Sequence, residues 1–261
     1  MPVSLLRYPG GKSRAVKIIL PLIPNNTTHL VSPFMGGGSV EHAWSKENIN
    51  GQVSACDFFK PLAIFWQQVR ENPEKVAEAV RSYFPLKKDR FYTLQQTHLS
   101  ERTHLEIAAQ FYVLNRSSFS GFTLSGGMSP GHARFTESSI IRLRDFRMPN
   151  VDVDAADMFN WLPATLENLS PTTTFIYLDP PYWLANSNLY GHKGNTHREF
   201  DHVRLGHLLS ELNQRGFRWL LSYNDTPELR SLYSKFVIQS VSWTYGMNKS
   251  KNSSEVLISN T

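Results

Sequence analysis

The sequence predicts an α/β fold, in which a mostly parallel sheet is covered by helices on both faces and interrupted by a smaller inserted segment. The main observation is an alternation of short β-rich runs with helical patterns, which occupies residues 29–67 and resumes over residues 151–259. The second observation is the stretch between them, which is helical at first and rich in glycine and serine later.

The first half of the predicted sheet precedes the insertion. Residues 29–34 form an apolar run that leads into three glycines, and residues 40–44 follow with a helical spacing. Residues 52–56 alternate as a strand does and end at Asp57, after which residues 61–69 continue as a helix. The order strand, helix, strand, helix is typical of parallel βαβ units.

The second half of the predicted sheet follows the insertion. Strands are expected over residues 151–153, 173–178, 219–222 and 255–259, and helices over residues 157–166 and 202–212. The chain has no internal repeat. Because strands that alternate with helices imply a mostly parallel sheet covered on both faces, we expect these elements to complete one sheet with those of the first half. We therefore divide the chain into a sheet domain, residues 1–67 and 151–261, and an insertion, residues 68–150.

The insertion changes character near its middle. Residues 73–115 carry helical apolar stripes, whereas loop composition begins after Arg116. The chain as a whole has a formal net charge of +5 and a pI of about 9.3. Within the insertion, the basic residues after position 115 are all arginines, namely Arg116, Arg134, Arg142, Arg144 and Arg147. Because arginine suits phosphates and base edges, a nucleic acid partner fits this segment as well as a solvated basic face does.

Composition excludes several other classes of protein. No apolar run approaches the roughly 18 residues that span a bilayer, and the first residues lack the pattern of a signal peptide. Cys56 is the only cysteine, which excludes a disulfide framework and a cysteine-based zinc site and fits a reducing cytoplasm. His192, His197, His202 and His207 recur every five residues, about 140° apart on a helix, so they share no face. We therefore expect no membrane segment and no metal.

The most informative segment follows the predicted strand over residues 173–178, where Asp179, Pro180, Pro181 and Tyr182 stand in succession. In an open parallel sheet, ligands bind outside the carboxyl ends of the strands. Neither proline donates a hydrogen bond, and Pro181 restricts Pro180, so the turn is stiff and leaves its carbonyls free. Such a turn can hold the Asp179 carboxylate and the Pro180 carbonyl as a fixed pair of acceptors. A proline-capped strand end without a function is the alternative.

This pair of acceptors suits methylation of adenine at its N6 amino group. The amino lone pair is delocalised into the ring, which makes the nitrogen a poor nucleophile. Two acceptors on the two N–H bonds draw electron density toward the nitrogen and favour a pyramidal geometry, in which the lone pair can point at an electrophilic methyl group. Stacking on Tyr182 would hold the base. We therefore expect Asp179, Pro180, Pro181 and Tyr182 to be the catalytic residues.

A second candidate segment follows the first predicted strand. Phe34, Gly36 and Gly38 belong to this segment, and its glycines let the backbone approach a ligand closely. The segment lacks the third glycine of the dinucleotide fingerprint. However, Asp57 ends the next strand about 20 residues later, where an acid commonly binds ribose hydroxyls. Together these features predict a site for an adenosine-containing cofactor.

The N-terminal run over residues 7–13 reads Arg-Tyr-Pro-Gly-Gly-Lys-Ser. It resembles a phosphate-binding P-loop superficially, but that motif needs a glycine where Leu6 stands. We therefore expect no ATP site. Lys12, on a glycine turn, remains available to meet a carboxylate or a phosphate.

These motifs, in this order, resemble those of the Dam-type DNA adenine-N6 methyltransferases, the alpha group of the D12 class. Residues 7–12 resemble the N-terminal cofactor motif of that family, residues 34–38 its F-x-G-x-G motif and residues 179–182 its catalytic motif. Residues 115–121 resemble the run that enters its DNA-recognition region, and residues 221–226 and 255–258 resemble its C-terminal motifs. The similarity spans almost the whole chain, and the catalytic motif is its most specific part.

The resemblance implies a Rossmann-like methyltransferase sheet that binds S-adenosylmethionine and a target-recognition insertion that binds DNA. The residues that would contact the cofactor are Tyr8, Lys12, Phe34, Gly36, Gly38, Asp57, Asp157 and Asp179. The residues that would contact DNA are Asn115, Arg116, Ser118 and Arg134. Of these, we expect Arg116 to touch a phosphate.

This sequence departs from the family pattern at two places. Tyr8 stands where tryptophan is frequent, which keeps an aromatic ring of different size. Residues 123–135 do not match familiar recognition loops. The target sequence is therefore open, and GATC, the site of the best-known members, is one candidate.

The resemblance thus implies transfer of a methyl group from S-adenosylmethionine to adenine N6 in double-stranded DNA, by base flipping and direct displacement, leaving S-adenosylhomocysteine. The alternatives are methylation of cytosine N4, methylation of RNA adenine, and catalytically silent DNA binding. Asp179 argues against the first, because cytosine enzymes more often carry serine there. Besides DNA, a cognate restriction endonuclease is an expected partner, and we expect a cytoplasmic enzyme of bacterial, archaeal or viral origin.

Overall fold

The computed structural model describes residues 4–97, 102–129, 134–183, 200–242 and 255–261. Its centre is a seven-stranded sheet with the strand order β3-β2-β1-β4-β5-β7-β6. The strands are β1 (His29–Ser32), β2 (Gln52–Asp57), β3 (Val151–Ala155), β4 (Thr174–Leu178), β5 (Arg218–Asn224), β6 (Val237–Val241) and β7 (Glu255–Ser259). β1 to β5 run parallel, and β7 is antiparallel to both β5 and β6. The expected α/β fold with a mostly parallel sheet is confirmed.

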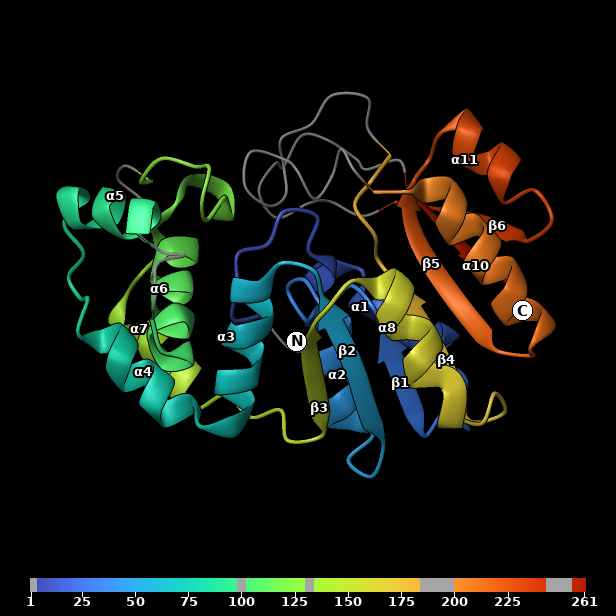
Figure 1. The fold of residues 1–261 in the computed structure, drawn as a ribbon, viewed down its shortest axis with the longest axis horizontal. Helices are drawn as coiled ribbons and strands as arrows, with labels where there is room; N and C mark the ends of the chain where they lie inside the picture. Colours follow the sequence, from blue (N-terminus) through green and yellow to red (C-terminus); the bar gives the residue numbers. More distant parts are fainter. Residues whose placement is uncertain (1–3, 98–101, 130–133, 184–199, 243–254) are drawn as a thin grey trace.

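Helices cover both faces of this sheet, with α8 and α10 in front of it and α2 behind it in the view of Figure 1. The helices on one face are α1 (Val16–Ile19), α2 (Ser39–Glu47) and α3 (Lys60–Glu71), and those on the other are α8 (Met158–Thr165), α10 (His202–Gln214) and α11 (Pro227–Leu232). Among the described residues, no helix is both long and apolar enough to cross a membrane.

Successive side chains of the central strands pack alternately into two separate hydrophobic cores, one on each face of the sheet. In β4, Phe175 and Tyr177 pack with the α2 and α3 side, whereas Ile176 and Leu178 pack with the α8 and α10 side. Successive side chains of a strand point to opposite faces, so a strand covered on both sides must be apolar throughout. The fully buried β4 therefore delivers Asp179 directly to the carboxyl edge of the sheet.

The insertion forms a helical body beside the β3 edge of the sheet (Figure 1). Its helices are α4 (Pro73–Arg81), α5 (Lys88–Thr97), α6 (His104–Ser117) and α7 (Glu137–Arg144). α6 begins at a capping box of Thr103 and Glu106 and packs against α3, where Tyr112 stacks on Phe65 with ring centroids 5.7 Å apart. Because α3 runs on to Glu71, the boundary expected at residue 68 falls inside a helix that belongs with the sheet. The division into two domains stays a prediction.

Several of the described elements were not expected from the sequence, and the short α1 is one of them. α7 lies in the part of the insertion that was interpreted as loop, and it begins at Thr136, whose side chain accepts a hydrogen bond from the Ser139 amide. β6 and α11 lie between the last two expected strands. β6 is an edge strand with no fully buried side chain, which is why its sequence shows no clear apolar pattern.

Candidate active site

A cavity of about 370 Å³ lies at the carboxyl ends of the parallel strands. The segments that follow four of these strands line it, over residues 33–38, 57–59, 156–159 and 179–181. β1 and β4 are neighbours in the sheet, and the chain leaves them toward helices on opposite faces. An α/β sheet opens a crevice for ligands at such a switch point, and the volume falls in the usual range for small-molecule sites.

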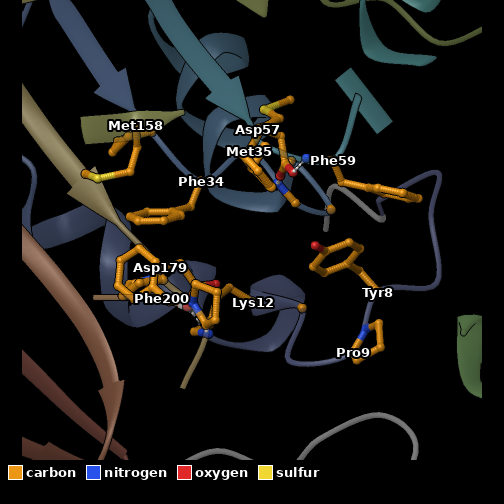
Figure 2. A pocket seen from close by; sticks show the side chains of 18 of the residues that line it. Tyr8, Pro9, Lys12, Phe34, Met35, Asp57, Phe59, Met158, Asp179 and Phe200 are labelled. Carbon is orange, nitrogen blue, oxygen red and sulfur yellow. Dashed lines mark hydrogen bonds and ion pairs between the residues drawn. The ribbon is translucent and has the colours of Figure 1, made fainter. Parts of the chain in front are cut away.

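All the residues predicted to contact a cofactor line this one cavity, namely Tyr8, Lys12, Phe34, Gly36, Gly38, Asp57, Asp157 and Asp179. Figure 2 shows Phe34, Met158 and Phe200 toward one side of the cavity and Tyr8 and Phe59 toward the other. The structure thus brings together residues from the N-terminus, β1, β2, β3 and β4. Their contact with a cofactor stays a prediction.

The glycine turn after β1 is shaped by its lack of side chains. Gly36 and Gly38 have φ angles of +45° and +63°, a region that favours glycine. The Tyr8 ring packs on this turn, and a Cβ atom on Gly36 would lie only 3.0 Å from Cε1 of that ring. The turn therefore needs glycine both for its backbone conformation and for the close approach of Tyr8.

Asp57 is fixed at the end of β2 by two backbone donors. Its carboxylate accepts hydrogen bonds from the amides of Gly36 and Phe59, each at 2.9 Å. Burial raises the pKa of Asp57 to about 6, although both hydrogen bonds act to lower it. A carboxylate has about four acceptor positions, so it can also accept hydrogen bonds from hydroxyl groups of a ligand.

Aromatic side chains line the end of the cavity away from Tyr8. Phe200 lies between Phe34 and Phe159, with ring centroids 5.6 Å from each. Asp157 begins α8 and accepts a hydrogen bond from the Phe159 amide at 2.8 Å. An apolar, ring-lined end beside a fixed carboxylate suits a planar heterocycle that carries an amino group.

The expected catalytic turn follows β4, and Lys12 lies against it (Figure 2). The Nζ atom of Lys12 donates to Oδ1 of Asp179 at 2.6 Å, to the hydroxyl of Tyr182 at 2.8 Å and to the carbonyl of Gly10 at 3.1 Å. Burial raises the pKa of Asp179, and the charge of Lys12 opposes this increase. Lys12 therefore meets a carboxylate, one of the two partners that its glycine turn allowed.

Two buried acids beside this ion pair were not expected from the sequence. Glu255 is 1% exposed, and one of its carboxylate oxygens lies 4.0 Å from Nζ of Lys12. Glu41 lines the cavity and accepts a hydrogen bond from the Ser32 hydroxyl at 2.5 Å. Burial raises the pKa of each of these glutamates to about 7. Asp179, Glu255 and Glu41 thus form a cluster of three acids around the predicted catalytic turn, and Lys12 lies beside the first two.

The residues predicted to contact DNA lie mostly inside the protein. Asn115 and Ser118 are fully buried, whereas Arg134 is exposed. Arg116 is 9% exposed, and its guanidinium donates two hydrogen bonds to the Arg134 carbonyl, at 3.0 and 2.8 Å. Burial lowers the pKa of Arg116 to about 10. The guanidinium of Arg116 is thus turned into the protein, and the phosphate contact expected of it, which would need the side chain to turn outward, stays a prediction.

Asn115 joins the segment over residues 115–134, the predicted recognition segment, to the N-terminal segment over residues 4–13. Its side chain accepts from the amide of Arg7 and donates to the carbonyl of Arg7, both at 2.9 Å. Gly121 follows at a φ of +77°, and a Cβ atom there would lie 2.1 Å from the Arg7 carbonyl oxygen. Because of this close docking, residues 121–125 of the insertion reach the cavity and line it. Phe119, next to them, is 60% exposed.

Comparison with known protein families shows the family to which this chain belongs. Residues 8–247 match the family of D12 class N6 adenine-specific DNA methyltransferases, which is most of the chain. The chain belongs to this family. Among the alternatives that the sequence left open, family membership selects adenine N6 in DNA over cytosine N4, RNA adenine and silent binding.

Curated relatives of this adenine methyltransferase have related names. It is 24% identical to the Type II methyltransferase M1.LlaDCHI of Lactococcus lactis subsp. cremoris, over 97% of this chain and 94% of the relative. It is 25% identical to the DNA N-6-adenine-methyltransferase of Escherichia phage P1, over 88% of this chain and 31% of the relative. It is also 25% identical to Modification methylase StsI of Streptococcus sanguinis, over 98% of this chain and 42% of the relative. The chain thus spans nearly all of the first relative and less than half of the other two.

Proposed function

We propose that this enzyme transfers a methyl group from S-adenosylmethionine to N6 of adenine in double-stranded DNA. The observation that carries the proposal is the presence of two fixed carboxylates, those of Asp57 and Asp179, in one cavity at the strand ends. The first suits a ribose and the second an amino group. Both the cofactor and the base could therefore reach the same crevice from different sides.

The residues that line the cavity fit S-adenosylmethionine, which supplies an electrophilic methyl group when it is bound. Asp57 would accept hydrogen bonds from the ribose hydroxyls, as its remaining lone pairs allow. The aromatic end of the cavity at Phe34 and Phe200 would hold the adenine ring of S-adenosylmethionine, with Asp157 beside that ring. The glycine turn at Gly36 would let the backbone approach the cofactor closely.

The catalytic turn would act on the target amino group. The Asp179 carboxylate and the Pro180 carbonyl would accept the two N–H bonds of N6 and direct its lone pair toward the methyl group. The product amine carries one proton fewer, and Asp179 would be the nearest base to accept that proton. Lys12 would keep Asp179 ionised and in place through the 2.6 Å ion pair.

The target adenine must leave the duplex stack to reach this turn, at a cost of a few kcal/mol. The exposed Phe119 lies on the recognition segment, two residues before the part of it that lines the cavity. Its apolar ring would fill space in the duplex that the base leaves. Arg134, also exposed on this segment, would contact the DNA backbone or a base edge.

The test is to identify the methylated base. Purified enzyme is incubated with labelled S-adenosylmethionine and either duplex DNA or RNA, and the digested nucleosides are separated by mass spectrometry. We expect N6-methyladenine from DNA, and we expect Asp179→Ala to abolish it while circular dichroism remains that of the folded protein. Label in cytosine, label in RNA alone, or full activity of Asp179→Ala would contradict the proposal.

We also propose that the enzyme methylates one short DNA sequence and works beside a cognate restriction endonuclease. Supporting this, the Lactococcus lactis relative is named as a Type II methyltransferase and the Streptococcus sanguinis relative as a modification methylase. Methylation-sensitive sequencing of plasmid DNA from cells that express the enzyme would give the target. Methylation scattered over unrelated sequences would refute site specificity, and GATC is one candidate site.

A further inference from the structure

The exit of the catalytic turn is held by a side chain from the neighbouring strand. The amide of Trp183 donates to Oδ1 of Asn224 at 3.1 Å, and Nδ2 of Asn224 donates to the Trp183 carbonyl at 3.1 Å. Asn224 is the last residue of β5. Its carboxamide therefore pairs with both backbone groups of Trp183, as a strand neighbour would.

This contact lies where the turn is hard to hold by other means. Regular pairing of β4 with β5 ends at Leu178, opposite Leu221. The turn that follows contains Pro180 and Pro181, which have no amide hydrogen to donate. Asn224 re-establishes the link to β5 directly after Tyr182. The backbone from Asp179 to Tyr182 is thus anchored by β4 at one end and by Asn224 at the other.

Tyr223, the neighbour of Asn224, supports the same segment from the other face of β5. Successive side chains of a strand alternate between faces. The Tyr223 hydroxyl is hydrogen-bonded to Nδ1 of His202, and the His202 ring stacks on the Trp183 ring with centroids 4.9 Å apart and planes 3° apart. Trp183 is therefore held twice, through its backbone by Asn224 and through its ring by His202.

We propose that Asn224 is a positioning residue for methyl transfer, which sets the geometry of the Asp179 carboxylate and the Pro180 carbonyl by fixing Trp183. Asn224 is not among the described residues that line the cavity, so it acts through the backbone and not by touching a ligand. The inference rests on the proposed function. A displacement near 1 Å of a catalytic group can reduce a rate on the order of 100-fold. We therefore expect the loss of the Asn224 side chain to lower the turnover rate and to leave the affinity for the cofactor unchanged.

The test compares Asn224→Ala with a matched control at the other end of the same sheet. Asn260 accepts from the Trp219 amide at 3.0 Å and donates to the Phe217 carbonyl and to Oδ1 of Asn213, both at 2.8 Å. Asn260→Ala therefore loses the same two kinds of backbone hydrogen bond and one more, far from the catalytic turn. We expect Asn224→Ala to lower kcat on the order of 10- to 100-fold, with the Kd for S-adenosylmethionine by calorimetry within about twofold of wild type. We expect Asn260→Ala to lower the melting temperature without lowering kcat by more than about threefold.

A second variant covers the case in which Asn224→Ala does not fold. Asn224→Asp is nearly the same size and keeps the acceptor for the Trp183 amide, but it cannot donate to the Trp183 carbonyl, so we expect kcat to fall at least about fivefold. A wild-type kcat in either variant, or an equal loss in Asn224→Ala and Asn260→Ala, would overturn the proposal. If the wild-type enzyme itself forms no N6-methyladenine, the proposed function fails instead, which keeps the two failures distinct.

Discussion

Replacing Lys12 with methionine tests whether the ion pair with Asp179 controls the reaction. Lys12 is buried, and its Nζ atom lies 2.6 Å from Oδ1 of Asp179. Methionine keeps the length and apolar character of the side chain but removes the charge and all three donated hydrogen bonds. Asp179 would then lose the cation that the described residues place beside it, while the charge of Glu255 would remain nearby.

The expected magnitude follows from the effect of an opposite charge on a carboxyl group. Burial already raises the pKa of Asp179, and Lys12 is the factor that lowers it. An opposite charge within about 4–6 Å typically lowers a carboxyl pKa by about 1–3 units, so the loss of Lys12 should raise the pKa of Asp179 further. The ionised carboxylate is the stronger acceptor and the form that can take up the proton, so the acidic limb of the kcat profile should move to higher pH, on the order of the 1–3 pH units typical of one opposite charge.

The measurement is kcat against pH with saturating DNA and S-adenosylmethionine, for wild type, Lys12→Met and Lys17→Met. Lys17 is exposed on α1, so its replacement controls for the loss of one positive charge. A ¹³C NMR titration of the aspartate carboxyls in the free enzyme reads the same pKa without needing activity. If the acidic limb and the Asp179 pKa of Lys12→Met both match wild type, Lys12 does not keep Asp179 ionised.

Three further predictions follow from the site. Asp57→Ala should weaken S-adenosylmethionine binding by about 1–3 kcal/mol, and calorimetry that gives an unchanged Kd would remove Asp57 from the cofactor site. Glu41 has its pKa raised from 4.5 to about 7, so the stability it contributes is present below pH 4.5 and is lost as the pH rises to 7, by about 3 kcal/mol. Scanning calorimetry should therefore show a smaller fall in Tm between pH 5 and pH 8 for Glu41→Gln than for wild type. Arg116→Ala should lower Tm and leave the salt dependence of DNA binding unchanged, whereas Arg134→Ala should flatten that dependence by about one unit of log–log slope; fluorescence anisotropy that gives the reverse result would restore Arg116 as the phosphate contact.

The sheet and the position of the site could be predicted because both depend on patterns that are local in the sequence. β4 is a short apolar run that must be buried on both faces, and Asp179 follows it directly. Since the carboxyl ends of parallel strands share one edge, Asp57 and Asp179 were expected at one crevice even though 122 positions separate them.

The acid cluster could not be predicted because burial of a charged residue leaves no periodic signal. Glu41 stands in the first turn of α2, where an acid is favoured at the surface by the helix dipole. However, α2 is buried around nearly its whole circumference, so no polar face distinguished Glu41 from an exposed residue. Glu255 likewise begins a strand, and only the strand order places it beside Lys12.

The burial of Arg116 could not be predicted for a related reason. The segment after it has loop composition, and an arginine at the entrance of a loop is normally exposed. Its neighbours in space are backbone carbonyls of Arg134 and Leu5, which are 18 and 111 positions away. The sequence pattern carried no information about these partners.

The contact between the insertion and the N-terminal segment has a consequence for protein engineering. The Asn115 side chain pairs with the amide and carbonyl groups of Arg7, and the Arg7 guanidinium donates a hydrogen bond to the Ser118 carbonyl at 2.8 Å. On the insertion side, these contacts use only the side chain of Asn115, the close approach at Gly121 and the backbone carbonyl of Ser118, because Arg7 belongs to the N-terminal segment. A recognition segment from a distant homologue should dock on the same catalytic frame if it brings an asparagine and a glycine at these two positions, together with an apolar helix to cover α3. New target specificities could then be obtained by exchange of the segment as a module, without redesign of the cavity.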